Sequence, residues 1–202
     1  MLHAVVLPLS TPQHVKRFTL NETAYYARMV GDIEDSRRVE PDFLLAERAM
    51  LDGWLEYHRT TLHLKCEGLD GEQLKSRPVA TSLLSLHGLV RHMAEVERHW
   101  FRRVFLRESD VADFWITDDN EDADLAPLDA ADFQMDLEVW QQECEASRLA
   151  VAERCLDDTG IGTRHGEPCS LRWIYTHMIE EYARHNGHAD LIRELVDGAV
   201  GC

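Results

Sequence analysis

Long apolar runs are missing from this chain of 202 residues. A membrane-spanning helix needs about 20 consecutive apolar residues. Near the start only the short stretch 4–9 is apolar, and His14, Lys16 and Arg17 follow it closely. We therefore expect neither a transmembrane segment nor a signal peptide.

Positive charge is also scarce. Lys and Arg number 21 against 37 Asp and Glu, which gives a formal net charge of −16. No segment is rich in Lys or Arg, and so negative a chain repels phosphate backbones and anionic lipid headgroups. Binding to nucleic acid or to a membrane surface is therefore only a minor alternative.

The five cysteines follow no recognisable pattern. None belongs to a C-x-x-C pair, and an odd number cannot form a complete set of disulfides. We expect a cytoplasmic protein whose thiols are free and serve mostly as small apolar residues. The cysteines are Cys66, Cys144, Cys155, Cys169 and Cys202.

Several catalytic motifs are absent as well. The sequence contains no G-x-S-x-G, no P-loop and no G-x-G-x-x-G that follows a predicted strand. Acyl hydrolysis by serine, NTP turnover and dinucleotide binding therefore lack their usual sequence support.

Helical periodicity dominates from residue 41 onward, and alternating runs of β-branched residues are scarce. Apolar residues recur at three- and four-residue steps in four long segments, which predicts an all-α protein. Helices of about 25 residues have the proportions of a four-helix bundle. We expect them near residues 41–66, 82–106, 129–156 and 170–196. Leu44 lies on the inward stripe of the first helix. Ser82 and Ser170 can cap the second and the fourth, and Gly198 can end the fourth.

The remaining segments have a different character. The link 107–128 is long and acidic, which suits a crossover at the end of the bundle, and we expect it to be a solvated loop. Glycines around Arg164 predict a small turn or hairpin over one mouth of the bundle. Residues 1–40 have no strong helical stripe. We therefore divide the chain into an N-terminal extension, 1–40, and a bundle, 41–202, with Met29 as an alternative start.

Ionisable side chains interrupt the apolar stripe of the last helix. Between Met178 and Ile192 the inward positions are Glu181, His185 and His188. An unpaired buried carboxylate costs several kcal/mol, so Glu181 needs a compensating partner. A divalent metal is one such partner, because Glu181 and His185 are four residues apart and project from one helix face.

The second predicted helix offers a third ligand. His92 shares an inward stripe with Leu89 and Val96, so two histidines and one carboxylate can meet in the bundle. That set suits Zn²⁺, or Fe²⁺ or Ni²⁺, and three protein ligands leave a position for substrate. An ordinary core histidine is the structural alternative. For Glu181, the alternative is an ion pair with Arg98, Arg172 or Arg184.

Two further residues are candidates for moving protons at such a site. His188 lies on the same stripe as Glu181 and His185. Glu95 follows His92 by three residues, at a position from which it can orient that ring. Each also has an ordinary interpretation, His188 as a core histidine and Glu95 as the partner of a neighbouring arginine.

Two stretches of the sequence resemble a known family. They are SLLSLHGLVRHMAEVERHWF, residues 82–101, and SLRWIYTHMIEEYARHNGHADLIRELVD, residues 170–197. Both resemble the DinB/YfiT-like superfamily of metal-binding four-helix bundles, and more narrowly its actinobacterial DinB-like members of unknown function. The resemblance covers residues 41–201.

The resemblance implies an up-up-down-down type of bundle with one metal. It places the ligands at His92 on the second helix and at Glu181 and His185 on the last. Many members have histidine at the position of Glu181, and the glutamate is similar instead to the pattern of mycothiol-dependent maleylpyruvate isomerase. Relatives of that kind use the metal to activate a low-molecular-weight thiol, as S-transferases or isomerases.

Together these observations predict a metal-dependent enzyme, with zinc as the expected metal, that brings mycothiol or a similar thiol to a small-molecule electrophile. Metal-dependent hydrolysis is one alternative, and a non-catalytic metal or small-molecule binding protein of the stress response is another. The oligomeric state stays open, with a homodimer among the alternatives. We also expect a pocket bordered by His92, Glu181, His185 and His188.

Overall fold

The computed structural model describes residues 36–201, so the predicted extension 1–40 lies almost entirely outside the described residues. The described chain is helical and contains no strand. The prediction of an all-α fold is therefore confirmed. Its elements are α2 (Glu47–Cys66), α3 (Gly71–Lys75), α4 (Leu86–Glu97), the π-helix η1 (Arg98–Phe105), α5 (Phe133–Val151) and α6 (Leu171–Asp197).

Short polar residues set the beginnings of three long helices. The side chain of Ser85 accepts from the backbone of Gly88 at the start of α4, and Asp132 and Ser170 cap α5 and α6 in the same way. Gly198 ends α6 in the left-handed conformation, which glycine adopts without strain. The expected cap and end of the last helix are thus correct.

The starts of the first two helices were predicted too early. The first helix begins at Glu47 rather than near residue 41, and Leu44, which we placed on its inward stripe, is 97% exposed. The second begins at Leu86 because Ser85 caps it, whereas the side chain of Ser82 accepts from the backbone of Leu84 in the preceding turn. Capping by either serine fits the sequence equally well.

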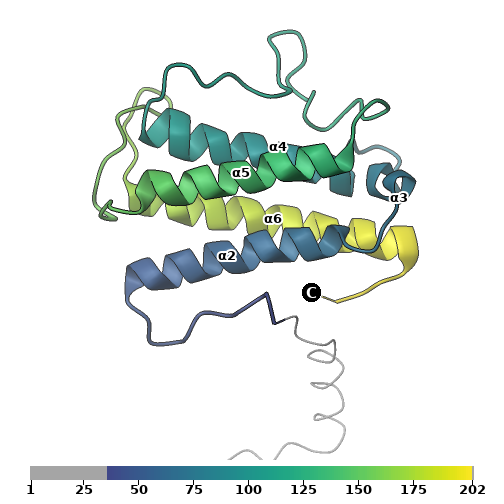
Figure 1. Ribbon diagram of the computed structural model, residues 1–202, viewed down its shortest axis with the longest axis horizontal. Helices are drawn as coiled ribbons and strands as arrows, with labels where there is room; N and C mark the ends of the chain where they lie inside the picture. Colours follow the sequence, from purple (N-terminus) through teal and green to yellow (C-terminus); the bar gives the residue numbers. More distant parts are fainter. Residues whose placement is uncertain (1–35, 202) are drawn as a thin grey trace, which may run out of the picture. The chain divides into compact units, whose positions relative to one another are not determined.

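Contacts near the helix ends establish the helix directions. Arg172 at the start of α6 bonds to Glu47 at the start of α2, at 2.7 Å, so these helices run in parallel. Asp136 near the start of α5 bonds to His87 near the start of α4, at 2.7 Å, so these two are parallel as well. Along the chain the directions are therefore up, down, down, up (Figure 1). Two helices run each way, as expected, but the parallel pair joined in sequence is α4 and α5.

Parallel helices joined in sequence require a long connection. Residues 106–132 return along the bundle from the end of η1 to the start of α5 (Figure 1), which confirms the predicted crossover. The link is not a solvated loop throughout. The backbone of Leu125 packs so closely on α4 that a Cβ at Gly88 would come within 3.0 Å of its carbonyl oxygen. The neighbouring Asp124 is 2% exposed.

Met178 and Ile192 of the last helix are buried as predicted, but between them the core lies on a different stripe from the one we predicted. Tyr182, Asn186 and Ala189 are buried, whereas Glu181, His185 and His188 are half-buried. The buried positions follow Met178 by steps of four, four and three residues, and the predicted positions follow it by steps of three, four and three. Both series fit a helical period of 3.6 residues. The ionisable residues consequently lie at the edge of the core, on the side of α6 that faces α4.

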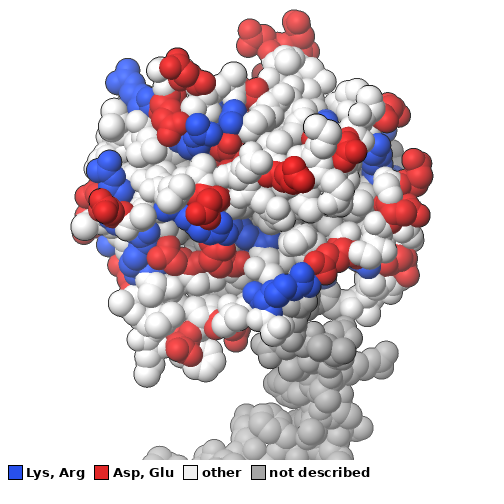
Figure 2. Space-filling view, in the orientation of Figure 1, with Lys and Arg blue, Asp and Glu red and all other residues white. Residues whose placement is uncertain are grey.

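Charged side chains of both signs lie across the visible face of the described chain (Figure 2). Figure 2 shows acidic side chains spread across the visible face, with Lys and Arg interspersed among them. None of the helices in residues 36–201 is long and apolar enough to span a membrane.

Candidate metal centre

Three predicted ligands come together between α4 and α6. His92, Glu181 and His185 each offer one ligand atom, and these atoms all lie within 4.8 Å of one another. The rings of His92 and His185 are 4.7 Å apart between centroids, and His185 Nε2 is 3.5 Å from Glu181 Oε2. All three side chains are half-buried. The arrangement can accommodate one cation at the meeting point of the three side chains.

A buried carboxylate orients the first of these histidines. Asp124 Oδ2 lies 2.8 Å from His92 Nδ1. An ionised carboxylate can only accept, so Nδ1 carries the hydrogen and Nε2 keeps its lone pair. Metal-binding histidines commonly donate their second N–H to a carboxylate in this way. The environment of His92 therefore fits a metal ligand.

His185, the second histidine, is kept in its metal-binding form by burial. Burial, assisted by the neighbouring His92 and His188, lowers the pKa of His185 to about 4. The ring is therefore neutral at pH 7, which is the form that binds a metal. Its Nδ1 lies 3.4 Å from Nδ1 of His188, and its Nε2 is on the side of Glu181.

The ion pairs proposed as an alternative for Glu181 do not form. Arg184 pairs with Glu180, Arg172 with Glu47 and Asp157, and Arg98 with Glu143. Glu181 instead makes short contacts with two histidines: His185, and His177, whose Nε2 is 3.4 Å from Glu181 Oε1. In the described chain, Glu181 is thus a carboxylate among imidazoles, which suits a shared cation.

A second group of potential ligands shares one member with the first. His177, Glu180 and Glu181 also have ligand atoms within 4.8 Å of one another. Glu180, however, is exposed and already paired with Arg184. The triad of His92, Glu181 and His185 is therefore the better candidate for a metal.

Glu95 does not orient His92. Its Oε1 accepts from the backbone N–H groups of Phe114 and Trp115, at 2.6 and 2.8 Å, and Asp124 takes the place at His92 instead. Glu95 Oε2 is buried without a hydrogen-bond partner among the described residues. Burial raises the pKa of this carboxyl group. A buried carboxylate oxygen with no partner favours uptake of a proton.

A cavity of about 280 Å³ adjoins the triad. Two triad residues border it, but His185 and His188 do not, so the predicted pocket is only partly correct. The cavity opens instead toward η1 and the segment after α5, which the sequence pattern could not place beside α6. Its lining consists of His92, Glu95, Val96, His99, Trp100, Asp113, Ile116, Arg164, His177 and Glu181.

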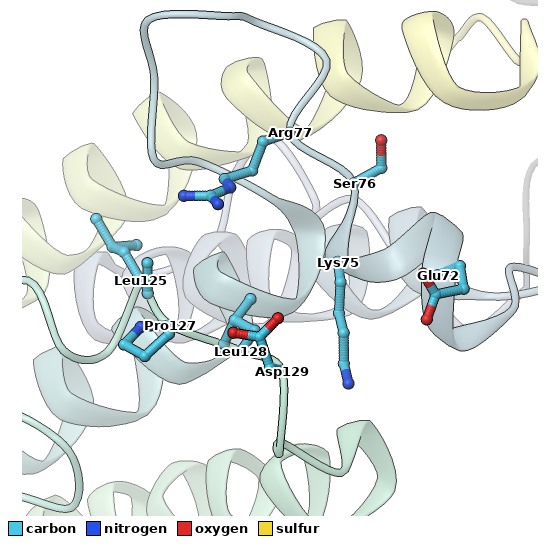
Figure 3. A pocket seen from close by; sticks show the side chains of 9 residues that line it. Glu72, Lys75, Ser76, Arg77, Leu125, Pro127, Leu128 and Asp129 are labelled. Atoms are coloured by element: carbon cyan, nitrogen blue, oxygen red, sulfur yellow. The ribbon is translucent and has the colours of Figure 1, made fainter.

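A larger hollow lies elsewhere, between the end of α3 and the link. It measures about 410 Å³ and shares no lining residue with the cavity beside the triad. The side chains of Lys75 and Arg77 extend over it, with Asp129 and Glu72 nearby (Figure 3). Two cations and two carboxylates balance there, so this hollow has no preference for one sign of charge.

Asp124→Asn should weaken metal binding by about 10–100-fold, the usual effect of losing a hydrogen-bond partner of a ligand histidine. The neutral amide still offers an oxygen to His92 Nδ1, but it lacks the negative charge that makes the imidazole a stronger donor to the metal. Competition with a chromogenic chelator measures the affinity. Asp122→Asn is the matched control, because Asp122 lies on the same link but is exposed. Equal affinities in wild type and Asp124→Asn would show that Asp124 has no part in metal binding.

Comparisons with known proteins agree with the geometry. A model of the mycothiol-S-transferase family matches residues 50–198, nearly the whole described bundle, whereas comparison with curated proteins finds no match. The matched range contains His92, Glu181 and His185 together with Glu95 and Asp124. It covers well over half of the chain, and the resemblance predicted from the sequence is confirmed. The chain belongs to the mycothiol-S-transferase family, which is one of the DinB-like families.

Proposed function

We propose that this protein is a metal-dependent S-transferase that joins mycothiol, or a similar low-molecular-weight thiol, to a small electrophile. The observation that carries the proposal is the triad of His92, Glu181 and His185 at the wall of a cavity. Membership of the mycothiol-S-transferase family supports the thiol as one substrate. Apolar walls at Val96, Trp100 and Ile116 leave room for the second.

The donor set supports zinc as the metal. Two neutral imidazoles and one carboxylate are a common ligand set for catalytic Zn²⁺, and the fourth position is left to substrate. When a divalent cation is held there, the pKa of a thiol bound beside it falls, and the nucleophilic thiolate exists near neutral pH.

Glu95 is the residue we propose to accept the proton of the thiol. Of the two candidates from the sequence, Glu95 borders the cavity and has a free Oε2, whereas His188 lies beside His185 and does not border it. The S–H proton passes to Glu95 and the sulfur becomes a thiolate. The sulfur then bonds to the electrophilic carbon, and the leaving group departs with its electron pair.

The test combines metal analysis with turnover. Untagged protein should contain one divalent metal per chain, and its metal-loaded form should conjugate mycothiol to 1-chloro-2,4-dinitrobenzene faster than the uncatalysed reaction. Stripping the metal should abolish this acceleration, and adding zinc should restore it. Turnover that needs no thiol would indicate a hydrolase, and thiol binding without turnover would indicate a binding protein; either result contradicts the proposal.

Glu95→Gln should lower kcat/KM by about 100-fold or more, as expected for loss of a general base. The wild-type rate should rise with pH through the raised pKa of Glu95, because only the ionised carboxylate accepts a proton. The variant should lose this rise while its metal content is unchanged. An identical pH profile in both proteins would exclude Glu95 as the proton acceptor.

A further inference from the structure

We infer that the second substrate is a planar electrophile with a carboxylate or similar anionic group, which Arg164 holds in the cavity beside Trp100. The role of this ligand as an electrophile rests on the proposed function. Its binding to Arg164 can be tested without any turnover.

The segment between α5 and α6 positions Arg164. Backbone N–H groups of Ile161 and Gly162 donate to Phe105 and Val104 at the end of η1, at 2.9 and 2.8 Å. The approach is so close that a Cβ at Gly162 would come within 2.6 Å of the Val104 carbonyl oxygen. Only glycine fits there, so the turn that carries Arg164 is fastened to η1 beside the cavity.

Arg164 is a cation without a carboxylate partner among the described residues. In contrast, Arg98, Arg102 and Arg103 of η1 all form ion pairs. Among the described residues, no acid of the cavity wall pairs with Arg164. Asp113 pairs with Arg103 at 2.5 Å, Glu95 accepts two backbone N–H groups, and Glu181 belongs to the triad. The guanidinium of Arg164 is therefore free to bind an anion in the cavity.

Aromatic rings form the wall beside this cation. Arg164 Cζ lies 5.1 Å from the centroid of the Trp100 ring, and the Trp100 and His177 rings are 4.4 Å apart. Trp173 stacks on His177 at 5.0 Å and also lies 5.1 Å from Trp100, so the three rings form one cluster. Trp100 belongs to η1, and π-helical turns occur frequently at functional sites. Trp100 is only 3% exposed, so just a small part of its ring borders the cavity. This flat aromatic wall favours a planar group packed along it.

Charge and shape together define the class of ligand. Trp100 and Arg164 border the same cavity as His92 and Glu181. A conjugated ring in this cavity can place its anionic group at Arg164 and its reactive carbon on the side of the triad. The planar fork of arginine is well suited to hold a carboxylate through two hydrogen bonds.

A binding experiment tests the anion site directly. The ligands are 3-nitrobenzoate and its methyl ester, which differ in charge and have no leaving group, and quenching of tryptophan fluorescence in the metal-loaded full chain reports binding. Arg164→Met should weaken binding of the acid by about 10-fold, equivalent to 1.4 kcal/mol, and leave binding of the ester unchanged. Arg154→Met is the control, because Arg154 is exposed and outside the cavity.

Two results would overturn the inference. Equal affinity of wild type and Arg164→Met for the acid would show that Arg164 binds no anion. Equal weakening for acid and ester would show that Arg164 only positions Trp100. Wild type should also prefer the acid over the ester, and added salt should reduce that preference.

Turnover of the chlorinated analogues separates this inference from the proposed function. With 4-chloro-3-nitrobenzoate the thiolate bonds to the carbon that carries chlorine, the C–Cl bond breaks, and chloride leaves with the electron pair. After correction for uncatalysed rates, Arg164→Met should lower kcat/KM about 10-fold for the acid only. If binding depended on Arg164 but neither compound were conjugated, the proposed transferase function would be rejected and the anion site at Arg164 would be supported. If instead both compounds were conjugated at rates that depend neither on Arg164 nor on the carboxylate, the transferase would stand and the anion site would be excluded.

Discussion

Arg59→Met should lower the free energy of unfolding by about 3–5 kcal/mol, the usual effect of breaking a buried ion pair. Arg59 is 4% exposed and Glu97 is not exposed at all. Two parallel hydrogen bonds of 2.8 and 2.7 Å join them. Methionine fills a similar volume but leaves the Glu97 carboxylate buried without its cation, which is the origin of the loss.

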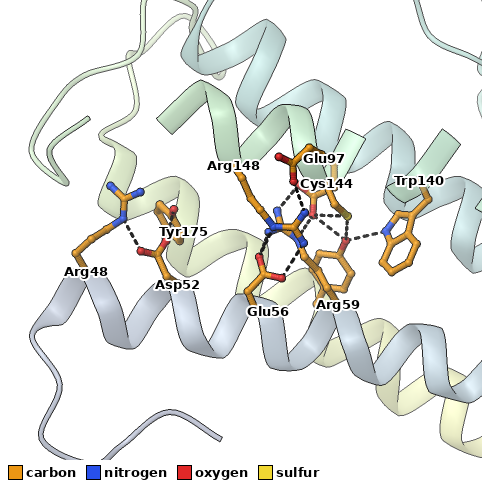
Figure 4. A network of polar contacts seen from close by, with 11 residues as sticks. Arg48, Asp52, Glu56, Arg59, Glu97, Trp140, Cys144, Arg148 and Tyr175 are labelled. Carbon is orange, nitrogen blue, oxygen red and sulfur yellow. Dashed lines mark hydrogen bonds and ion pairs between the residues drawn. The ribbon is translucent and has the colours of Figure 1, made fainter. Parts of the chain in front are cut away.

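The loss should be large because this pair connects all four long helices. Tyr182 of α6 donates to Glu97 Oε1 at 2.7 Å, and Trp140 of α5 donates to the Tyr182 hydroxyl at 2.9 Å (Figure 4). Burial, together with Cys144 and Glu97, raises the pKa of Tyr182, so the phenol keeps the proton that it donates. Arg59 belongs to α2 and Glu97 to α4.

Urea unfolding followed by circular dichroism measures the effect. Arg184→Met is the control, because it removes an exposed pair with Glu180 and should cost less than about 1 kcal/mol. The double variant Arg59→Met, Glu97→Gln should recover part of the loss, since no charge is then left buried. A loss below 1 kcal/mol for Arg59→Met alone would show that water reaches Glu97.

Local sequence signals predicted the helices well. Periodicity located all four long helices, and Ser170 and Gly198 marked the ends of the last one. These signals work because capping and amphipathicity involve residues within a few positions of one another. The starts of the first two helices were predicted less well, and for the second helix Ser82 and Ser85 are equally good caps by local sequence.

The triad was predictable because two of its members lie on one helix. The spacing of Glu181 and His185 brings them together wherever α6 lies, and His92 follows from the facing helix. The position of the triad relative to the core was less predictable. Glu181 and His185 belong to a stripe next to the core rather than to the core itself, and both stripes fit the helical period.

Residues from the links could not be assigned to the site from the sequence. Asp124 is 32 positions from His92, inside an acidic segment whose other members give no reason to single it out. Glu95 bonds to residues of the link 106–132, and Arg164 lies on the segment between α5 and α6, so the environment of each depends on the path of a long connection. Those paths depend on tight packing at Gly88 and Gly162, which no periodic pattern reveals.

His185→Ala should remove the metal and reduce turnover by more than 100-fold, beyond the 10–100-fold typical for loss of a partner of a ligand. A ligand bound only by the folded state stabilises it by about 4 kcal/mol at a thousand times its Kd. For a chain of this size that corresponds to roughly 10 °C in Tm. The metal-loaded wild type should therefore melt about 10 °C above the variant.

The decisive comparison is between loss of the ligand and loss of the metal. Stripped wild type should melt close to His185→Ala, and stripping the variant should change its Tm very little, because both changes remove the same interaction. Glu181→Gln, which keeps the shape of the side chain, should behave like His185→Ala, whereas His63→Ala should keep the full response to metal because His63 lies on α2 outside the triad. If His185→Ala lowered Tm equally in loaded and stripped protein, His185 would be a packing residue and the metal centre would have to be abandoned.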